Sequence, residues 1–180
     1  MKNLPDIQAM ALKREQGFTL LEVLITVAVL AILTALAAPN FRKLMDKNAV
    51  TTQANELMSN ILLARSEAVK RNQRVVVRRS GGWKDRVIVF ADSNNNDTYQ
   101  SATDGPLIVD HQTPDNTVAI AGHGAAATFI RFNSRGRAVT AGGNSLTPNN
   151  DYFTLSKDGQ TRYICFTPTG RPRVQETSCP

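Results

Sequence analysis

The sequence predicts an α+β fold in which one long N-terminal helix packs on a mostly antiparallel β-sheet. An apolar run at residues 18–38 is long enough for a helix, and a pattern of helical period continues through residues 39–72. From residue 73 to residue 180 the chain changes to short β-branched and aromatic segments separated by turn residues. We therefore expect one helix in two halves, followed by a β-rich globular domain.

The composition excludes several classes of protein. The chain has 180 residues, 42% of them hydrophobic, and 21 Lys+Arg against 15 Asp+Glu, a formal charge of +6. These values are ordinary for a globular protein and exclude disorder over the full length. The two cysteines and two histidines form no zinc or haem motif, and no phosphate-binding or nucleophile-elbow motif is present. We therefore expect no enzyme, with no catalytic residues, no metal and no cofactor.

The apolar run from Phe18 to Ala38 predicts a transmembrane helix. It has 21 residues and one ionisable group, Glu22, and a helix of this length spans about 30 Å, the thickness of the hydrocarbon core. A secretory signal peptide cleaved after Ala37 is the alternative, but the length of the run and the position of Glu22 favour a membrane anchor. A carboxylate in the apolar phase costs on the order of 3 kcal/mol and is usually functional. Flanking Lys and Arg residues are balanced, so charge predicts no orientation.

The second half of the helix is predicted by a single apolar stripe. Its positions recur at spacings of 4, 3, 4, 3 and 4: Val50, Ala54, Leu57, Ile61, Ala64 and Ala68. We expect this stripe to pack on the sheet and the helix to end near Arg71 and Asn72. Pro39 removes one helical hydrogen bond, so we expect a kink or local melting at the membrane edge.

The globular half reads as a series of strands. Residues 74–79 and 85–91 form a hairpin across Gly81 and Gly82. Further strands are predicted at residues 107–111, 117–121, 127–132, 137–141, 152–157 and 162–167, with turn residues between them. No second strong helical pattern is present.

The segment around the start of the apolar run resembles a known signal. Residues 13–22 read KREQGFTLLE, which is similar to the class III leader of type IV pilins and type II secretion pseudopilins. The resemblance implies that a prepilin peptidase removes residues 1–17, cutting after Gly17, and that Phe18 is then methylated. It also implies that Glu22 pairs with the free amine of Phe18 on a neighbouring subunit, which gives a buried charge its partner.

The resemblance also implies a location and partners. We expect a single-pass inner-membrane protein with a periplasmic C-terminal domain, which reaches the pilus and the cell surface after assembly with other pilin subunits. Pro39 lies where many pilins carry a proline.

Two further segments narrow the resemblance to the FimT/GspH minor pilins. They are residues 129–137, FIRFNSRGR, and residues 167–173, TPTGRPR. In FimT-like members a Gly-Arg-x-Arg motif is associated with DNA binding during natural transformation. The resemblance therefore implies DNA binding at Gly170, Arg171 and Arg173. A GspH-like pseudopilin of type II secretion and a minor pilin that acts only in pilus assembly remain as alternatives.

Charge is unevenly distributed along the globular half. From residue 131 onward there are seven basic and three acidic residues. Arg131, Arg135 and Arg137 could extend a basic surface that attracts phosphate without reading sequence. Arginine suits this role because its planar fork grips phosphate oxygens at two points. The alternative is an ordinary solvated face.

Two smaller features carry expectations of their own. Cys165 and Cys179 would be bridged in an oxidising periplasm, closing a loop of about 15 residues worth roughly 3 kcal/mol; two free thiols are the alternative. Residues 92–97, DSNNND, partly resemble a calcium loop. That loop wants Gly where Asp97 stands and Glu where Thr103 stands, so we expect a polar turn instead.

Overall fold

The computed structural model describes residues 17–112 and 117–180. The chain divides into two compact units, Met1–Asn40 and Phe41–Pro180. The longest element, helix α1, runs from Leu20 to Arg71 and contributes to both units. All of the strands belong to the second unit.

The first unit contains the apolar part of α1. Thr19 caps the helix, since its Oγ1 accepts the N–H of Glu22 over 3.2 Å. The large apolar side chains from Leu20 to Leu36 are exposed, and this helix is long and apolar enough to cross a membrane. Local melting at Pro39 is not observed, because α1 is continuous through it. A proline costs the helix one donor without removing the hydrogen bonds of its neighbours.

The second half of α1 buries the predicted stripe. Val50, Ala54, Leu57, Ile61, Ala64 and Ala68 are all at most 3% exposed. The helix ends at Arg71 as expected, where Asn72 takes a left-handed φ of +51°. Gln73 then donates its N–H to the carbonyl of Ala68 over 3.2 Å, which closes the last turn.

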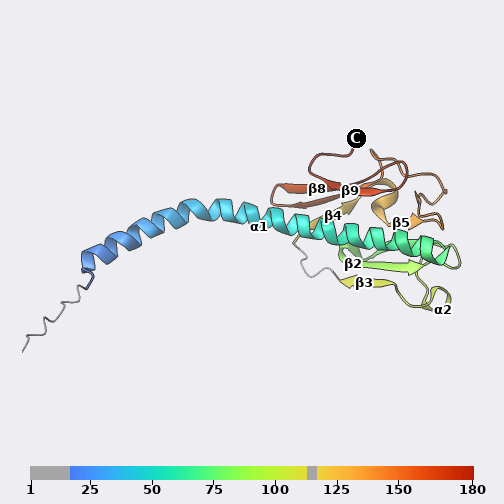
Figure 1. Cartoon of the computed structure of the whole chain (residues 1–180), viewed down its shortest axis with the longest axis horizontal. Helices are drawn as coiled ribbons and strands as arrows, with labels where there is room; N and C mark the ends of the chain where they lie inside the picture. The colour runs from blue at the N-terminus through green and yellow to red at the C-terminus, as the bar shows by residue number, and fades with distance from the viewer. Residues whose placement is uncertain (1–16, 113–116) are drawn as a thin grey trace, which may run out of the picture. The chain divides into compact units, whose positions relative to one another are not determined.

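The strands form two antiparallel sheets rather than one. The first has the order β3-β2-β1-β5-β6, with β1 Val75–Ser80, β2 Gly82–Ala91, β3 Val109–Gln112, β5 Phe129–Phe132 and β6 Ala138–Val139. The second has the order β4-β7-β8-β9, with β4 Ala119–Gly122, β7 Tyr152–Lys157, β8 Gln160–Phe166 and β9 Pro172–Gln175. The second half of α1 lies against both sheets (Figure 1) and shares one hydrophobic core with them.

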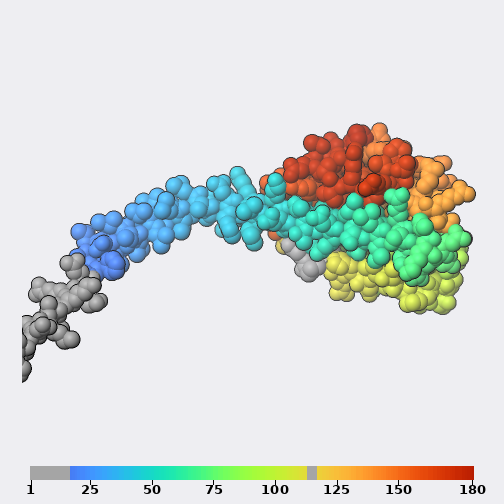
Figure 2. Space-filling view, viewed as in Figure 1, coloured from blue at the N-terminus to red at the C-terminus, as the bar shows by residue number. Residues whose placement is uncertain are grey.

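Alternation along the strands decides which side chains reach that core. In β7 and β8 the inward residues Phe153, Leu155, Ile164 and Phe166 are at most 1% exposed. Their outward neighbours are partly exposed, as the two-residue period of a strand requires, except for Cys165, which is fully buried and bridged to Cys179 of the tail. The opposite face of α1 stays visible between the C-terminal strands and the first sheet (Figure 2), so neither sheet covers it.

Three short elements were not predicted. Helix α2, Ser101–Asp104, and the 3₁₀ turn η1, Gly124–Ala127, have four residues each. Elements of one turn carry no hydrophobic period. Strand β9 begins at Pro172 in a segment expected to be a loop. Proline is tolerated there because it is the first residue of an edge strand.

Candidate functional site

The two segments that carry a Gly-Arg pair, Asn133–Arg137 and Thr167–Arg171, fold as turns with the same hydrogen-bond pattern. In each, the N–H of the first residue donates to the carbonyl of the last, and the glycine N–H donates back to the first residue. These distances are 3.0 and 2.8 Å in Asn133–Arg137, and 2.9 and 2.7 Å in Thr167–Arg171. Gly136 and Gly170 have φ of +71° and +77°, which glycine adopts without strain. We call these two segments the paired turns.

Gly170 packs one of the paired turns against the end of the other. A Cβ at this position would lie 2.4 Å from the backbone N of Ala138 and 3.1 Å from its Cα. Ala138 directly follows Arg137, and consecutive Cα atoms are about 3.8 Å apart, so the Cα atoms of Arg137 and Arg171 are at most about 10 Å apart. Two segments distant in the sequence therefore present their arginines close together.

The arginines of this region are available to a ligand. Arg135, Arg171 and Arg173 are exposed, and none of them forms an ion pair with any residue that the structure describes. Arg137 is also exposed, and its guanidinium donates to Oγ of Ser145. We call these four arginines the basic surface. Cations without partners attract a polyanion from solution.

The structure does not support the predicted place of Arg131 beside them. Its side chain is only 5% exposed and pairs with Asp97 over 2.8 Å. The same guanidinium donates to the carbonyl of Thr140. The alternating period of strand β5 turns this residue toward the loop that follows β2, so Arg131 is unavailable to phosphate.

Arg65 is a cation that sequence analysis missed. A Cβ at Gly136 would lie 3.4 Å from Cγ and 3.5 Å from Nε of Arg65, so this side chain runs along the first of the paired turns. One indication of this contact is present in the sequence, because Arg65 directly follows Ala64 of the buried stripe on α1. Helical period places Arg65 at the edge of the packed face, from which a long side chain reaches a neighbouring turn.

A groove of about 570 Å³ separates α1 from the edge strand β9. Two residues of the basic surface line it, Arg171 and Arg173, together with Asn55, Met58, Leu62, Thr167, Pro172 and Val174. Its wall therefore combines the apolar Met58 and Leu62 of the helix with two arginines on the strand side.

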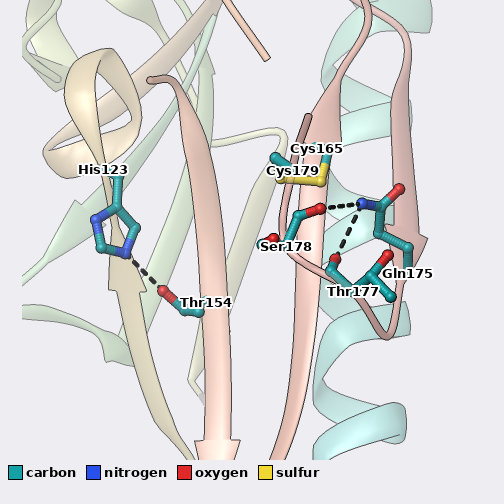
Figure 3. Close-up of a disulfide and its surroundings, with 7 residues drawn as sticks. All are labelled: His123, Thr154, Cys165, Gln175, Thr177, Ser178 and Cys179. Atoms are coloured by element: carbon teal, nitrogen blue, oxygen red, sulfur yellow. Dashed lines mark hydrogen bonds between the residues drawn. A yellow bond between two sulfur atoms is a disulfide. The ribbon is translucent and has the colours of Figure 1, made fainter. Parts of the chain in front are cut away.

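The predicted disulfide is present between Cys165 and Cys179, with the Cα atoms 5.6 Å apart. It joins β8 to the C-terminal tail (Figure 3). Gln175 holds the same tail, since its Nε2 donates to the carbonyls of Thr177 and Ser178 over 3.0 Å each. Cys165 pairs in register with Arg173 of β9, so the bridge restrains the strand that carries this arginine.

The acidic loop after β2 is organised by its own backbone. Asp92 is fully buried, accepts the N–H groups of Asn96 and Asp97 over 3.1 and 3.2 Å, and pairs with Arg74. Asp97 pairs with Arg131. Within residues 17–112 and 117–180, no group of three or more His, Cys, Asp or Glu could hold a metal ion. The carboxylates of Asp92 and Asp97 are therefore engaged by N–H groups of the loop and by arginines.

The predicted processing residues lie in the first unit, just before α1. Gly17 and Phe18 precede α1, and Phe18 is 83% exposed. A Cβ at Gly17 would meet no atom within 4 Å, so local packing does not require glycine there. Glu22 lies in the first turn of α1, exposed to the surroundings of the helix.

Two sequence profiles of known protein families match this chain. The sequence profile described as "Type II transport protein GspH" matches residues 53–170, more than half of the chain. The chain belongs to the GspH family. The profile described as "Prokaryotic N-terminal methylation motif" matches residues 12–38 of this GspH-family protein. That match covers Gly17, Phe18 and Glu22 together with the apolar run. No match is found among curated protein sequences.

The GspH-family chain has the fold of a type IV pilin. A crystal structure of the type IV minor pilin FimU from Pseudomonas aeruginosa PAO1 matches 76% of this chain and 96% of its own, with a TM-score of 0.54 at 17% identity. FimU in a second crystal form matches 72% and 96%, with a TM-score of 0.53 at 17% identity. At this identity the likeness is one of fold, and it confirms the predicted helix on antiparallel strands.

Proposed function

We propose that this GspH-family protein is a minor pilin that binds DNA during natural transformation, through phosphate contacts and without base preference. The observation that carries the proposal is the pair of Gly-Arg turns, packed together at Gly170 and Ala138. The two turns and the start of β9 present the basic surface, whose four arginines form no ion pair with any residue that the structure describes. Phosphates are the same in every sequence, so such a surface binds DNA non-specifically.

The restraints on this surface favour binding. The disulfide fixes β9 and its tail, and Gly170 holds the second of the paired turns against β6. Less conformational freedom then remains to be lost when the arginines engage phosphate, which raises affinity. Because a guanidinium presents a planar fork of donors, each arginine can hold two oxygens of one phosphate.

Processing and assembly form the second part of the proposal. A prepilin peptidase cuts after Gly17 and Phe18 is methylated, which leaves the apolar part of α1 as a membrane anchor with the globular unit in the periplasm. In the filament Glu22 pairs with the amine of Phe18 on a neighbouring subunit. A carboxylate held in hydrocarbon is costly unless a cation pairs with it, so the pairing favours assembly.

The test of DNA binding in the cell is a double variant, Arg171→Ala with Arg173→Ala, in a transformable host. Both side chains are exposed, so the variant should fold and enter pili normally while DNA uptake is lost. The matched control is Arg79→Ala with Lys84→Ala, which removes the same charge from the exposed tip of the β1–β2 hairpin. Uptake at the wild-type level in the Arg171 and Arg173 variant would overturn the proposal.

The second candidate is a role in assembly alone, as a pseudopilin of type II secretion or a minor pilin that primes a pilus. The description of the matched family, a type II transport protein, favours it. So does the uncovered face of α1, where Leu62 and Val69 are 42% and 54% exposed. Under this candidate, deleting the protein abolishes secretion or piliation, and the double arginine variant behaves as wild type in both.

A further inference from the structure

The outer face of the second sheet carries aromatic side chains that the fold does not use. The chain is poor in aromatic residues, at 6%, yet Tyr152, Tyr163 and His123 meet on this face. The rings of His123 and Tyr152 are stacked, with centroids 4.3 Å apart and an angle of 15°. Tyr163 lies 6.4 Å from Tyr152. We call these three residues the aromatic strip.

The strip does not belong to the hydrophobic core. All three residues are partly exposed, and none is part of either hydrophobic cluster in the described chain. A hydrogen bond with strand β7 holds His123 in place, since its Nε2 lies 2.6 Å from Oγ1 of Thr154. Figure 3 shows this contact between His123, which directly precedes η1, and Thr154 of β7, on the face where the disulfide lies. The rings are therefore fixed in position at a solvent-facing surface.

Strand register aligns the strip with the basic surface. Tyr152 of β7 pairs with Cys165 of β8, and Cys165 pairs with Arg173 of β9. Directly paired residues point to the same face of a sheet, and neighbouring strands are about 4.8 Å apart. Arg173 and Tyr152 thus stand on one face with their backbones about 10 Å apart, on the two sides of the disulfide.

We propose that this face binds single-stranded DNA, with bases stacked on the aromatic strip and the backbone held by Arg173. Unpaired bases expose both faces of their rings and stack on aromatic side chains regardless of sequence, while a cationic groove follows the phosphates. In a duplex the bases are already stacked on one another, so only the phosphate contacts remain. The inference rests on the proposed function and names its substrate more closely.

The experiment compares two ligands and two pairs of variants. Fluorescence anisotropy measures the affinity of the full chain, in nonionic detergent, for a labelled single strand and for the duplex of the same length. Tyr152→Leu with Tyr163→Leu keeps apolar bulk and removes the rings, whereas Tyr152→Phe with Tyr163→Phe keeps the rings. We expect the leucine variant to bind the single strand at least roughly tenfold more weakly, and the phenylalanine variant to stay within about twofold of wild type.

The duplex serves as the control for folding and for the proposed function. The leucine variant should bind duplex as wild type does, because its phosphate contacts are intact. If the leucine variant binds the single strand with wild-type affinity, the aromatic strip does not bind bases, and the proposal of phosphate-mediated duplex binding is unaffected. Failure of the wild-type chain to bind either ligand overturns the proposed function itself.

Discussion

Among single residues, Gly170 sets the position of the arginine that follows it. Its φ of +77° disfavours any side chain, and a Cβ would meet the backbone of Ala138 at 2.4 Å. We predict that Gly170→Ala lowers the free energy of unfolding by about 2 kcal/mol or more, from strain and overpacking together. It should also weaken DNA binding, because Arg171 is displaced.

The control for Gly170→Ala is Gly142→Ala. A Cβ at Gly142 has 3.7 Å to its nearest neighbour, Asn144 Nδ2, and its φ is outside the left-handed region. Urea unfolding followed by the fluorescence of Trp83, the only tryptophan, measures both variants. Equal midpoints for the two variants would show that the contact with Ala138 does not stabilise the paired turns.

Glu22 is a residue whose charge can be separated from its place in the helix. The cap on α1 uses its backbone N–H and Thr19 Oγ1, so Glu22→Gln preserves the cap and removes only the charge. We predict normal membrane insertion and cleavage before Phe18, seen by mass spectrometry of the membrane fraction, but little variant protein in sheared pili. A variant present in pili at wild-type levels would contradict the pairing with the amine of Phe18.

The arginines show what sequence can and cannot predict at this scale. Their motif singled out Arg171 and Arg173, and the structure shows that both are exposed, while their role in binding stays a prediction. Arg131 belongs to the segment 129–137 that also carried the resemblance, but its environment is set by Asp97, 34 positions away. Arg65 was missed because its place beside the basic surface depends on a contact with Gly136, which lies in a turn far away in the sequence. Spacing along the chain does not encode such contacts.

At the scale of elements, the last turn of α1 is held by charge. Glu67 accepts from Arg71 Nε over 2.6 Å and pairs with Lys70 over 3.4 Å, and the hydrogen bond from Arg71 is the main reason that its pKa lies below the ordinary value. The strand pair β2–β3 has a similar contact. Arg86 donates to Asp110 over 2.6 and 2.7 Å and lowers the pKa of that carboxyl.

A pH dependence follows from these two carboxyls. A lowered pKa in the folded state means that the stabilisation is complete above the ordinary pKa, about 4, and is lost as pH falls through the lowered value. We predict that the urea midpoint of wild type declines as pH falls from about 5 to about 2, and that Glu67→Gln with Asp110→Asn declines less. An equally steep decline in the variant would show that neither pair contributes.

Periodicity predicted the long elements well and the short ones poorly. The stripe from Val50 to Ala68 fixes a helical face over five turns, and the structure buries all of it. Strand β9 was not predicted, because Gly170 and Pro172 indicate a turn. It becomes a strand through pairing with β8, which is a tertiary contact. The division into two sheets has the same origin, since alternation identifies a strand but not its neighbours.

For the whole molecule, the family match and the fold agree on one type of protein. The match to the GspH family and the FimU-like fold identify a pilin-type protein. The formal charge of +6 attracts polyanions at long range. Any basic protein of similar charge would do the same. We propose that the contacts with DNA are made by the basic surface and not by net charge alone.

Counterion release separates these two sources of binding. Each phosphate neutralised by a cation contributes about 0.9 to the slope of log affinity against log salt concentration. A variant that loses two phosphate contacts must therefore show a shallower slope, whereas a change in net charge elsewhere leaves the slope nearly unchanged.

The measurement is the salt dependence of duplex affinity for three proteins: wild type, Arg171→Ala with Arg173→Ala, and the matched control Arg79→Ala with Lys84→Ala. The account predicts that the first variant binds more weakly on every DNA sequence, with a slope reduced by about 2, while the control keeps the wild-type slope. Wild-type affinity and slope in the Arg171 and Arg173 variant, or an equal loss in the control, would contradict it.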